Sequence, residues 1–217
     1  DVGNWQFAAS SDVNGDGTAD LVFRDGSVHA VAYVNDGLAT NWAYLFRARA
    51  DLDPWYAVAG GDLDGDGYGD LVFQRGDSGV YAVVLQRSNT WLAVQYLTGS
   101  RRDLDPWRVV GAGDTDADGL WDLVVQRAGE SIYGLVFVQG WSVREAWYLT
   151  GARTNLSPWA FRAASDLDGD GFDELVFQEG ATNQYEAAFV DGYSILLSSP
   201  LFTGSGGLSG WTIVGPK

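Results

Sequence analysis

Cysteine and methionine are absent from the 217-residue chain, and histidine occurs once, at His29. Without cysteine the chain has no disulfide framework, no thiolate metal site and no cysteine nucleophile. With one histidine, no Ser-His-Asp or Cys-His arrangement stands out. No apolar run reaches the roughly 18 residues that a membrane-spanning helix needs. We therefore expect no membrane span and no catalytic residue, although the scattered glutamates leave a glycosidase-type carboxylate pair open.

Basic residues are also scarce, because lysine occurs only at Lys217 and the formal net charge is −16. Phosphate binding needs a basic surface, so this charge argues against a nucleic-acid partner. An acidic, lysine-poor surface has two explanations, a salty environment or bound cations. The chain begins at Asp1 and shows no signal peptide, which indicates a processed or excised segment.

Apolar residues are plentiful, at 46% of the chain, and 14% of the chain is aromatic. This composition argues against disorder and is ample for a sizeable core. The length alone allows either one large β domain or two small ones.

Tryptophan marks an internal repeat, recurring at intervals of 50, 52, 52 and 52 residues. The residues in phase are Trp5, Trp55, Trp107, Trp159 and Trp211. After each of the first four comes a short apolar run, an acidic loop and another apolar run. The loops read DVNGDGTADLVF from Asp12, DLDGDGYGDLVF from Asp62, DTDADGLWDLVV from Asp114 and DLDGDGFDELVF from Asp166.

The repeats divide the chain, as a single domain, into units 1–50, 51–102, 103–154 and 155–206, with 207–217 as the first strand of a fifth repeat. Each unit reads as four short strands, rich in β-branched and aromatic residues and separated by Gly, Asp, Asn and Ser. In the second unit they are roughly Trp55–Gly60, Leu71–Gln74, Val80–Gln86 and Ala93–Leu97. Such units predict an all-β fold, a β-propeller of four blades of about 52 residues, either a closed four-blade ring or a segment of a larger propeller.

The string WRVVGAGD from Trp107, followed by the acidic loop and Asp122-Leu123-Val124, resembles the FG-GAP/VCBS type of repeat. The resemblance covers essentially the whole chain, four times in register. That type of repeat occurs in integrin-like propellers and in many secreted bacterial proteins, and some fungal lectins with a similar repeat bind sugars between blades. The resemblance therefore implies calcium loops on β-hairpins and a role in adhesion or recognition.

The acidic loops carry oxygen ligands at positions 1, 3 and 5, and a glycine after position 5 lets the backbone curl so that they converge. Ca²⁺ is coordinated by six to eight oxygens, so three side chains are too few. We therefore expect the backbone carbonyl of position 7 and the side chain of position 9 to be ligands as well. The expected ligands are Asp12, Asn14, Asp16, Thr18 and Asp20; Asp62, Asp64, Asp66, Tyr68 and Asp70; Asp114, Asp116, Asp118, Leu120 and Asp122; and Asp166, Asp168, Asp170, Phe172 and Glu174.

These loops are not EF-hands, because position 12 of the second loop is Phe73 and the last ligand stands at position 9. The plain alternative is that Asp and Gly are common turn residues, but carboxylates converging without a cation would repel. Zinc would need His or Cys ligands, and Mg²⁺ usually keeps several waters. Sixteen of the 29 acidic residues lie in these loops, so about four Ca²⁺, one per repeat, would change the net charge from −16 to −8.

A site with a dissociation constant of ~0.1 mM, in ~1 mM free Ca²⁺, would stabilise the fold by ~1.4 kcal/mol. Four sites would then contribute ~6 kcal/mol, comparable with the whole stability of an ordinary domain. The cytosol holds far too little free Ca²⁺ for this. We therefore expect a secreted or cell-surface protein.

Aromatic residues outside the repeat pattern are candidates for ligand contact. Trp91, Trp141 and Tyr193 fall near the turn between the third and fourth strands and align only loosely. Exposed aromatics of this kind can grip a sugar ring or a partner. The five phased tryptophans are expected to pack between blades, as is His29, whose slot is tyrosine in the other three repeats.

A surplus strand begins at Trp211, where a fifth copy starts and stops before its acidic loop. Three outcomes fit: a segment of a longer propeller, a strand on a blade edge, or a strand that completes a neighbouring molecule. The last would be end-to-end self-association by head-to-tail strand addition.

The leading interpretation is an extracellular, calcium-binding, non-catalytic propeller that recognises a glycan or an extracellular protein. One alternative is an accessory domain of a secreted polysaccharide-degrading enzyme. The other is a structural unit of a cell-surface fibre.

Overall fold

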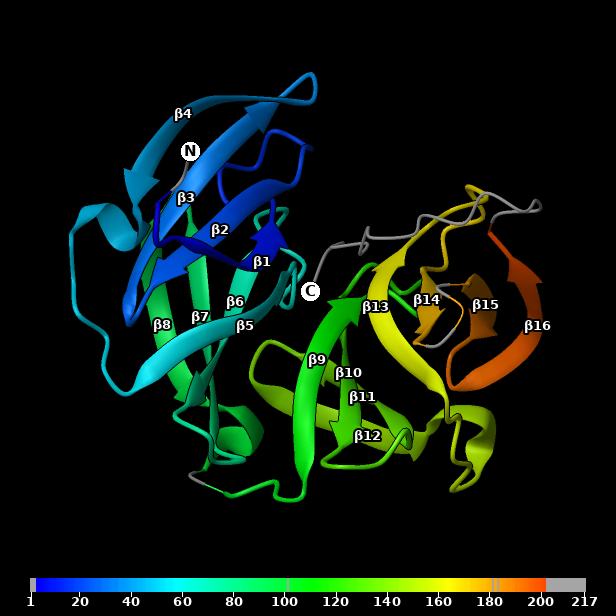
Figure 1. The fold of residues 1–217 in the computed structure, drawn as a ribbon. Helices are drawn as coiled ribbons and strands as arrows, with labels where there is room; N and C mark the ends of the chain where they lie inside the picture. The colour runs from blue at the N-terminus through cyan, green and yellow to red at the C-terminus, as the bar shows by residue number, and fades with distance from the viewer. Residues whose placement is uncertain (1–2, 101, 181, 183, 202–217) are drawn as a thin grey trace.

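The computed structural model describes residues 3–100, 102–180, 182 and 184–201, and within them sixteen strands form four antiparallel sheets (Figure 1). The first sheet holds β1 (Gln6–Ser11), β2 (Asp20–Asp25), β3 (Val28–Asn35) and β4 (Leu38–Tyr44). The second holds β5 (Trp55–Gly61), β6 (Asp70–Arg75), β7 (Tyr81–Arg87) and β8 (Thr90–Tyr96). The third holds β9 (Trp107–Gly113), β10 (Asp122–Arg127), β11 (Tyr133–Gln139) and β12 (Ser142–Tyr148). The fourth holds β13 (Trp159–Ser165), β14 (Glu174–Glu179), β15 (Tyr185–Asp191) and β16 (Ser194–Pro200).

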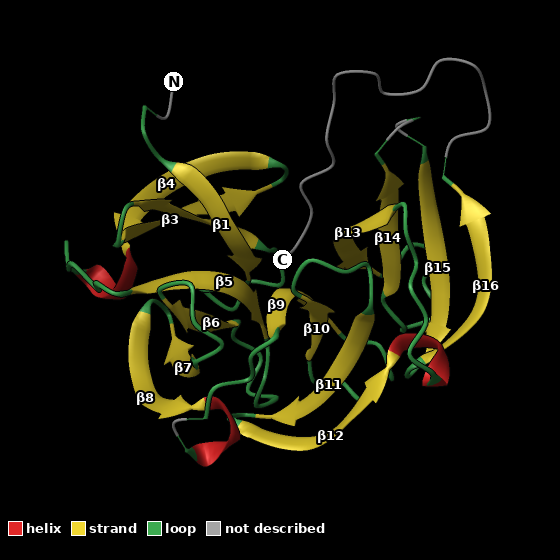
Figure 2. Ribbon diagram, turned by 60° about the horizontal axis from the view of Figure 1, so that its bottom comes forward, coloured by secondary structure: helices red, strands yellow, loops and turns green. Residues whose placement is uncertain are grey.

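Each sheet is one blade, with its strands paired in chain order, and the four blades are arranged as a β-propeller (Figure 2). The first strand of each blade lies innermost, so that β1 packs on β5, β5 on β9 and β9 on β13. Within the described residues, no packing of similar extent joins β13 to β1. The predicted all-β propeller of four four-stranded blades is confirmed.

The second blade shows where the predicted strands and the observed ones differ. Its fourth strand starts at Thr90, three residues before the predicted start at Ala93. Ser88 and Asn89 both have positive φ, at 47° and 59°, so they form a two-residue hairpin turn that lets the strand begin at once. Sequence analysis expected a longer connection, between Gln86 and Ala93, because no glycine marks this short turn. Leu97 begins a single 3₁₀ turn instead of ending the strand.

Three such 3₁₀ turns follow the outer strands of the first three blades, and they are the helical segments that the described residues contain. They span Leu45–Arg47, Leu97–Gly99 and Leu149–Gly151. None of them is long and apolar enough to cross a membrane. The predicted first strand of a fifth repeat, 207–217, lies outside the described residues.

The hydrophobic core lies between blades rather than within one. One cluster joins the first blade to the second through Val22, Val31 and Phe73. Equivalent clusters join the second blade to the third and the third to the fourth. Trp55, Trp107 and Trp159 pack against these clusters, as expected for the phased tryptophans. A blade with apolar residues on both faces therefore needs a neighbour on each side.

His29 and the tyrosines in its slot form a bridge between blades. The Ala57 backbone N–H donates to Nε2 of the buried His29 at 3.0 Å, while Nδ1 of His29 lies 3.0 Å from the Ser27 carbonyl. In the next two interfaces, Val109 donates to the Tyr81 hydroxyl at 3.1 Å and Phe161 donates to the Tyr133 hydroxyl at 3.1 Å. Because Nε2 accepts a hydrogen bond here, the bridge requires neutral imidazole.

Burial accordingly lowers the pKa of His29 from 6.5 to about 4. The unfolded chain binds a proton at this residue more readily than the folded chain, so stability present above pH 6.5 is lost as the pH falls toward 4. We expect His29→Tyr, which installs the residue of the other repeats, to keep the bridge and to remove about 3 kcal/mol of this acid-induced loss. Denaturant unfolding of both proteins at pH 7 and pH 4.5 measures the difference, and parallel losses in the two proteins would contradict it.

Candidate metal sites

The four acidic loops occupy the same place in every blade, between its first and second strands. In the second blade the loop runs from Asp62 to Gly69, between β5 and β6. The Asp62 carboxylate accepts hydrogen bonds from the backbone N–H groups of Gly65, Asp66 and Gly67, at 2.7, 3.2 and 2.8 Å. The first residue thus closes the loop around its own side chain, and bonds of this kind recur in the other three loops.

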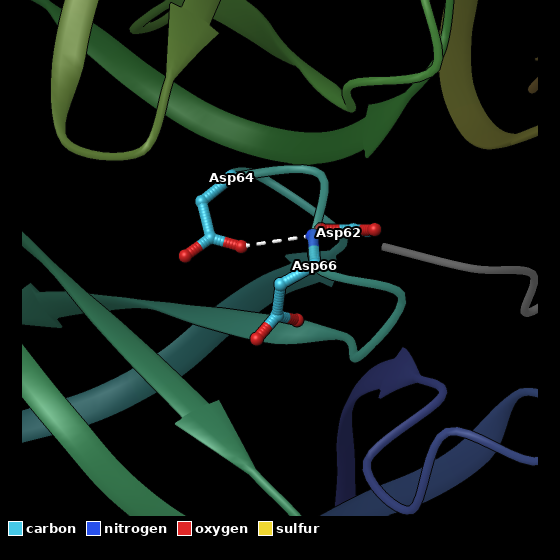
Figure 3. Close-up of side chains that lie close together, drawn as sticks. All are labelled: Asp62, Asp64 and Asp66. Atoms are coloured by element: carbon cyan, nitrogen blue, oxygen red, sulfur yellow. Dashed lines mark hydrogen bonds between the residues drawn. The ribbon is translucent and has the colours of Figure 1, made fainter.

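The side chains at positions 3 and 5 continue this pattern. Asp64 accepts from the N–H of Asp66 at 3.2 Å (Figure 3), and Asp66 accepts from the N–H of Tyr68 at 2.9 Å. In all four loops the aspartate carboxylate at position 5 accepts a hydrogen bond from the backbone N–H of position 7, at 2.9 Å. Curling of this tightness needs positive φ at positions 4 and 6, which glycine adopts readily, with φ of 80° at Gly65 and 84° at Gly67.

In three loops the acidic side chains approach one another closely enough to hold a metal ion, with one oxygen of each within 4.8 Å of the others. The groups are Asp62, Asp64 and Asp66; Asp114, Asp116 and Asp122; and Asp166, Asp168 and Glu174. Asp70, Asp118 and Asp170 are not members of these groups. In the first loop Asn14 stands at position 3 and donates from Nδ2 to Asp16 at 3.0 Å. The carbonyl ligands at position 7 stay predictions.

The carboxylates at position 9 are the buried members of each loop. Asp20, Asp70 and Asp122 are fully buried and Glu174 nearly so. Burial raises the pKa of Asp20 to about 6, that of Asp122 to about 7 and that of Asp70 to about 8. Burial also raises the pKa of Glu174. Each of these carboxylates would gain from a nearby positive charge.

Position 9 has a structural role that sequence analysis missed. Oδ1 of Asp20 accepts from the N–H of Val34, and Oδ1 of Asp70 accepts from the N–H of Gln86, where the third strand of each blade bulges. Asp20 Oδ2 and Asp122 Oδ1 are buried and accept no hydrogen bond from the described residues. A buried carboxylate oxygen without a partner is costly, and a cation would satisfy it. The all-oxygen donor set and these two atoms fit a hard divalent cation.

Two arginines contact the acidic loops, and sequence analysis predicted neither. Arg87, at the end of β7, lies 2.8 Å from Asp66. Arg144, on β12, lies 2.6 Å from Asp118 and 3.2 Å from Asp116. Both stand more than 20 residues from the aspartates that they contact, and neither recurs in the repeat pattern, so no local signal marked them. Their guanidinium groups would compete with a cation for the same oxygens.

The three aromatic candidates lie on three different blades. Trp91, on β8, is 58% exposed and lines a groove of about 630 Å³ together with Trp55 and Tyr96. Trp141 is partly buried against the core between the second and third blades. Tyr193 is partly buried and stacks on Trp147, with ring centroids 5.0 Å apart. Trp91 is therefore the candidate with the most open ring.

Comparison with known proteins supports the repeat and the fold. Residues 12–73 match the family model of the FG-GAP-like repeat, in agreement with the predicted resemblance. The chain is also similar to the solved structure of an Agrocybe aegerita lectin described by its specific recognition of non-reducing terminal N-acetylglucosamine, with a TM-score of 0.52 and 16% identity. The match covers 88% of this chain and 50% of that one, so this chain spans about half the length of the lectin. No curated protein matches.

Removing the guanidinium group at the third loop should strengthen cation binding there. We expect Arg144→Gln to raise the affinity of that loop for Ca²⁺ by about twofold to fivefold, because an exposed ion pair is worth ~0.2–1 kcal/mol. Arg153→Gln is the matched control, since Arg153 pairs with Glu130 instead of an acidic loop. Calorimetric titration of both variants measures the effect, and equal affinities would contradict it.

Proposed function

We propose that this chain is a calcium-stabilised propeller that works outside the cell as a non-catalytic recognition module for glycans. The observation that carries the calcium assignment is the pair of unpartnered, buried oxygens of Asp20 and Asp122 beside a curled loop of oxygen donors. In the other two blades position 9 is also a buried carboxylate, Asp70 or Glu174, and Asp70 accepts backbone hydrogen bonds at both of its oxygens. One hard cation per loop would offset the charge repulsion that a buried carboxylate meets there.

Calcium fits these loops better than other common cations. The donors are carboxylates, one amide and backbone carbonyls, with no histidine or cysteine to favour zinc. The ligands proposed for each site are the side chains of positions 1, 3, 5 and 9 and the carbonyl of position 7. The ion supplies no chemistry in this proposal, because it acts by holding the loop closed and by pairing the buried carboxylate.

The extracellular setting follows from the proposed affinity. Loops of this type bind calcium at roughly 0.1–1 mM in extracellular modules, a concentration that the cytosol does not reach. The FG-GAP-like match over residues 12–73 supports the same setting, because such repeats are typical of extracellular proteins.

A glycan is the ligand class that the aromatic groove favours. Trp55, Trp91 and Tyr96 line it, together with apolar side chains that include Leu52, Phe73 and Val84. Sugar rings stack their C–H faces on such aromatic surfaces. The similar lectin recognises a terminal N-acetylglucosamine, which supports a saccharide ligand for the groove. The neutral, buried His29 serves packing, in keeping with a module that binds without catalysis.

Chelating calcium should destabilise the protein strongly. The loss of four sites worth ~1.4 kcal/mol each should lower Tm by about 10–20 °C. Asp64→Asn should remove one calcium from the stoichiometry, whereas Asp77→Asn, an exposed aspartate outside the loops, should leave it unchanged. Calorimetric melting in calcium and in excess chelator checks the first expectation, and an unchanged melt would refute the calcium assignment.

Glycan binding should depend on the open tryptophan of the groove. On a glycan array in calcium we expect binding that Trp91→Ala weakens about tenfold or more, because one stacked aromatic ring is worth ~1–2 kcal/mol. Leu38→Ala is the control, an exposed apolar side chain outside the groove. Absence of any glycan signal from the folded, calcium-loaded protein would count against recognition and favour a structural role.

A further inference from the structure

The acidic loops of neighbouring blades are joined to one another by hydrogen bonds. At position 8 of a loop, the backbone N–H donates to the carbonyl at position 1 of the preceding loop. The pairs are Gly69 to Asp12 at 2.7 Å, Trp121 to Asp62 at 2.9 Å and Asp173 to Asp114 at 2.7 Å. The four loops therefore form a connected row, in which the first residue of one loop is held by a residue near the end of the next.

Position 7 adds a side-chain contact to this joint. The ring of Tyr68 lies against Gly15, at position 4 of the first loop, so closely that a Cβ added to Gly15 would lie 2.5 Å from a ring carbon. Leu120 lies against Gly65 in the same way, and a Cβ added there would lie 3.0 Å from the leucine side chain. Glycine at position 4 thus makes room for the neighbouring loop as well as for the curl of its own.

Position 9 of the second loop is tied to the first blade by two routes. The hydroxyl of Ser11, directly before the first loop, donates to the Asp70 carbonyl at 3.0 Å. The backbone N–H of the buried Gln86 donates to Oδ1 of Asp70 at 3.0 Å. The side-chain amide of Gln86 donates to the carbonyl of Gly69 and, at 3.2 Å, to that of Val13. Gln86 therefore connects the position-9 carboxylate of the second loop with position 2 of the first.

Backbone groups take the place of the Gln86 amide in the next two interfaces. The N–H of Gly140 donates to the Leu63 carbonyl at 2.5 Å, and the N–H of Gly192 donates to the Thr115 carbonyl at 2.9 Å. Leu63 and Thr115 stand at position 2 of their loops. In each of these interfaces, the blade that follows an acidic loop holds that loop at positions 1 and 2.

The residues that join the first two loops are those that a cation would order. The Tyr68 carbonyl and the Asp70 carboxylate are proposed ligands of the second loop, and they flank Gly69. Asp12, which Gly69 holds, is a proposed ligand of the first loop. A cation in the second loop would restrict residues 68–70, so less ordering would remain to be done when the first loop binds its own. By linkage, the first loop would favour binding at the second to the same degree.

Charge repulsion between filled loops does not oppose this coupling. Each loop carries at least three carboxylates. A loop that holds one divalent cation therefore keeps a net negative charge, and it still attracts a cation to the loop beside it.

We propose that neighbouring acidic loops bind calcium cooperatively, and that Tyr68 and Gln86 are the positioning residues that couple the first loop to the second. This coupling rests on the calcium binding proposed above and adds that the sites are not independent. The chain would then fill its loops over a narrower range of calcium concentration than four separate sites would.

Removal of one site tests the coupling. Asp64→Ala deletes an exposed ligand side chain of the second loop (Figure 3). We expect the first and third loops, which adjoin it, to lose calcium affinity by about fivefold or more, the lower end of the usual coupling between sites. Asp77→Ala, at an exposed aspartate outside the loops, should leave every affinity unchanged. Calorimetric titration with calcium gives the number of sites and their stepwise affinities.

The ring contact is tested without removing a site, because the ligand at position 7 is a backbone carbonyl. We expect a Hill coefficient above unity for the parent chain, a lower value for Tyr68→Ala and the parent value for Tyr68→Phe, which keeps the ring against Gly15. Tyr56→Ala is the matched control. Tyr56 is also a half-buried tyrosine with an arginine over its ring, but it lies on β5, outside the acidic loops.

The amide contact is tested by Gln86→Met, which keeps a long side chain but has no N–H group to donate to Val13. We expect this variant to lower the Hill coefficient as Tyr68→Ala does. Melting of all variants in excess chelator measures their stability without calcium. A variant that melts like the parent there and still binds less cooperatively has lost coupling instead of folding.

Binding of calcium with a Hill coefficient of unity would overturn the proposal, as would unchanged affinities at the other loops of Asp64→Ala. Equal cooperativity in Tyr68→Ala, Gln86→Met and the parent would overturn the roles of these two residues. A folded chain that binds no calcium would refute the calcium assignment itself, so the two failures are distinguishable.

Discussion

Burial of apolar side chains between neighbouring sheets is the constraint on which the rest of this structure depends. A four-stranded blade here carries apolar residues on both faces, so it cannot shield them by itself. The first, second, third and fourth blades each contribute to clusters shared with a neighbour. Stability is therefore built from interfaces between repeats, as in other repeat architectures, and the two end blades are the places where that scheme is incomplete.

The acidic loops belong to this same scheme. Each loop curls around its own first carboxylate, yet its first carbonyl accepts a hydrogen bond from the loop of the next blade, as in the bond from Gly69 to Asp12. The position-9 carboxylate, such as Asp70, links its loop to the third strand of the same blade. A cation in the loop would thus stabilise a joint between blades as well as a turn. Calcium binding and blade packing are expected to act together for this reason.

Much of the fold follows from the period of the repeat. The phased tryptophans, the alternation of apolar runs with acidic loops and the four-strand units all lead to the propeller that is observed. The close approach of Asp62, Asp64 and Asp66 was also expected, because their spacing and the following glycine are local features. The start of β8 was misplaced, since the Ser88-Asn89 turn uses positive φ without glycine.

The sequence by itself determined the repeating unit, the hairpin that holds each acidic loop and the oxygen donors within it. These depend on neighbouring residues, whose preferences can be read along the chain. The tertiary structure alone decided that Arg144 reaches Asp116 and Asp118, that Asp122 keeps a buried oxygen without a hydrogen-bond partner among the described residues, and that Leu167 stays exposed. Each of these depends on which distant strand or blade lies nearby. Identical repeats have identical local sequences but unequal neighbours, and that inequality appears only when the blades are packed.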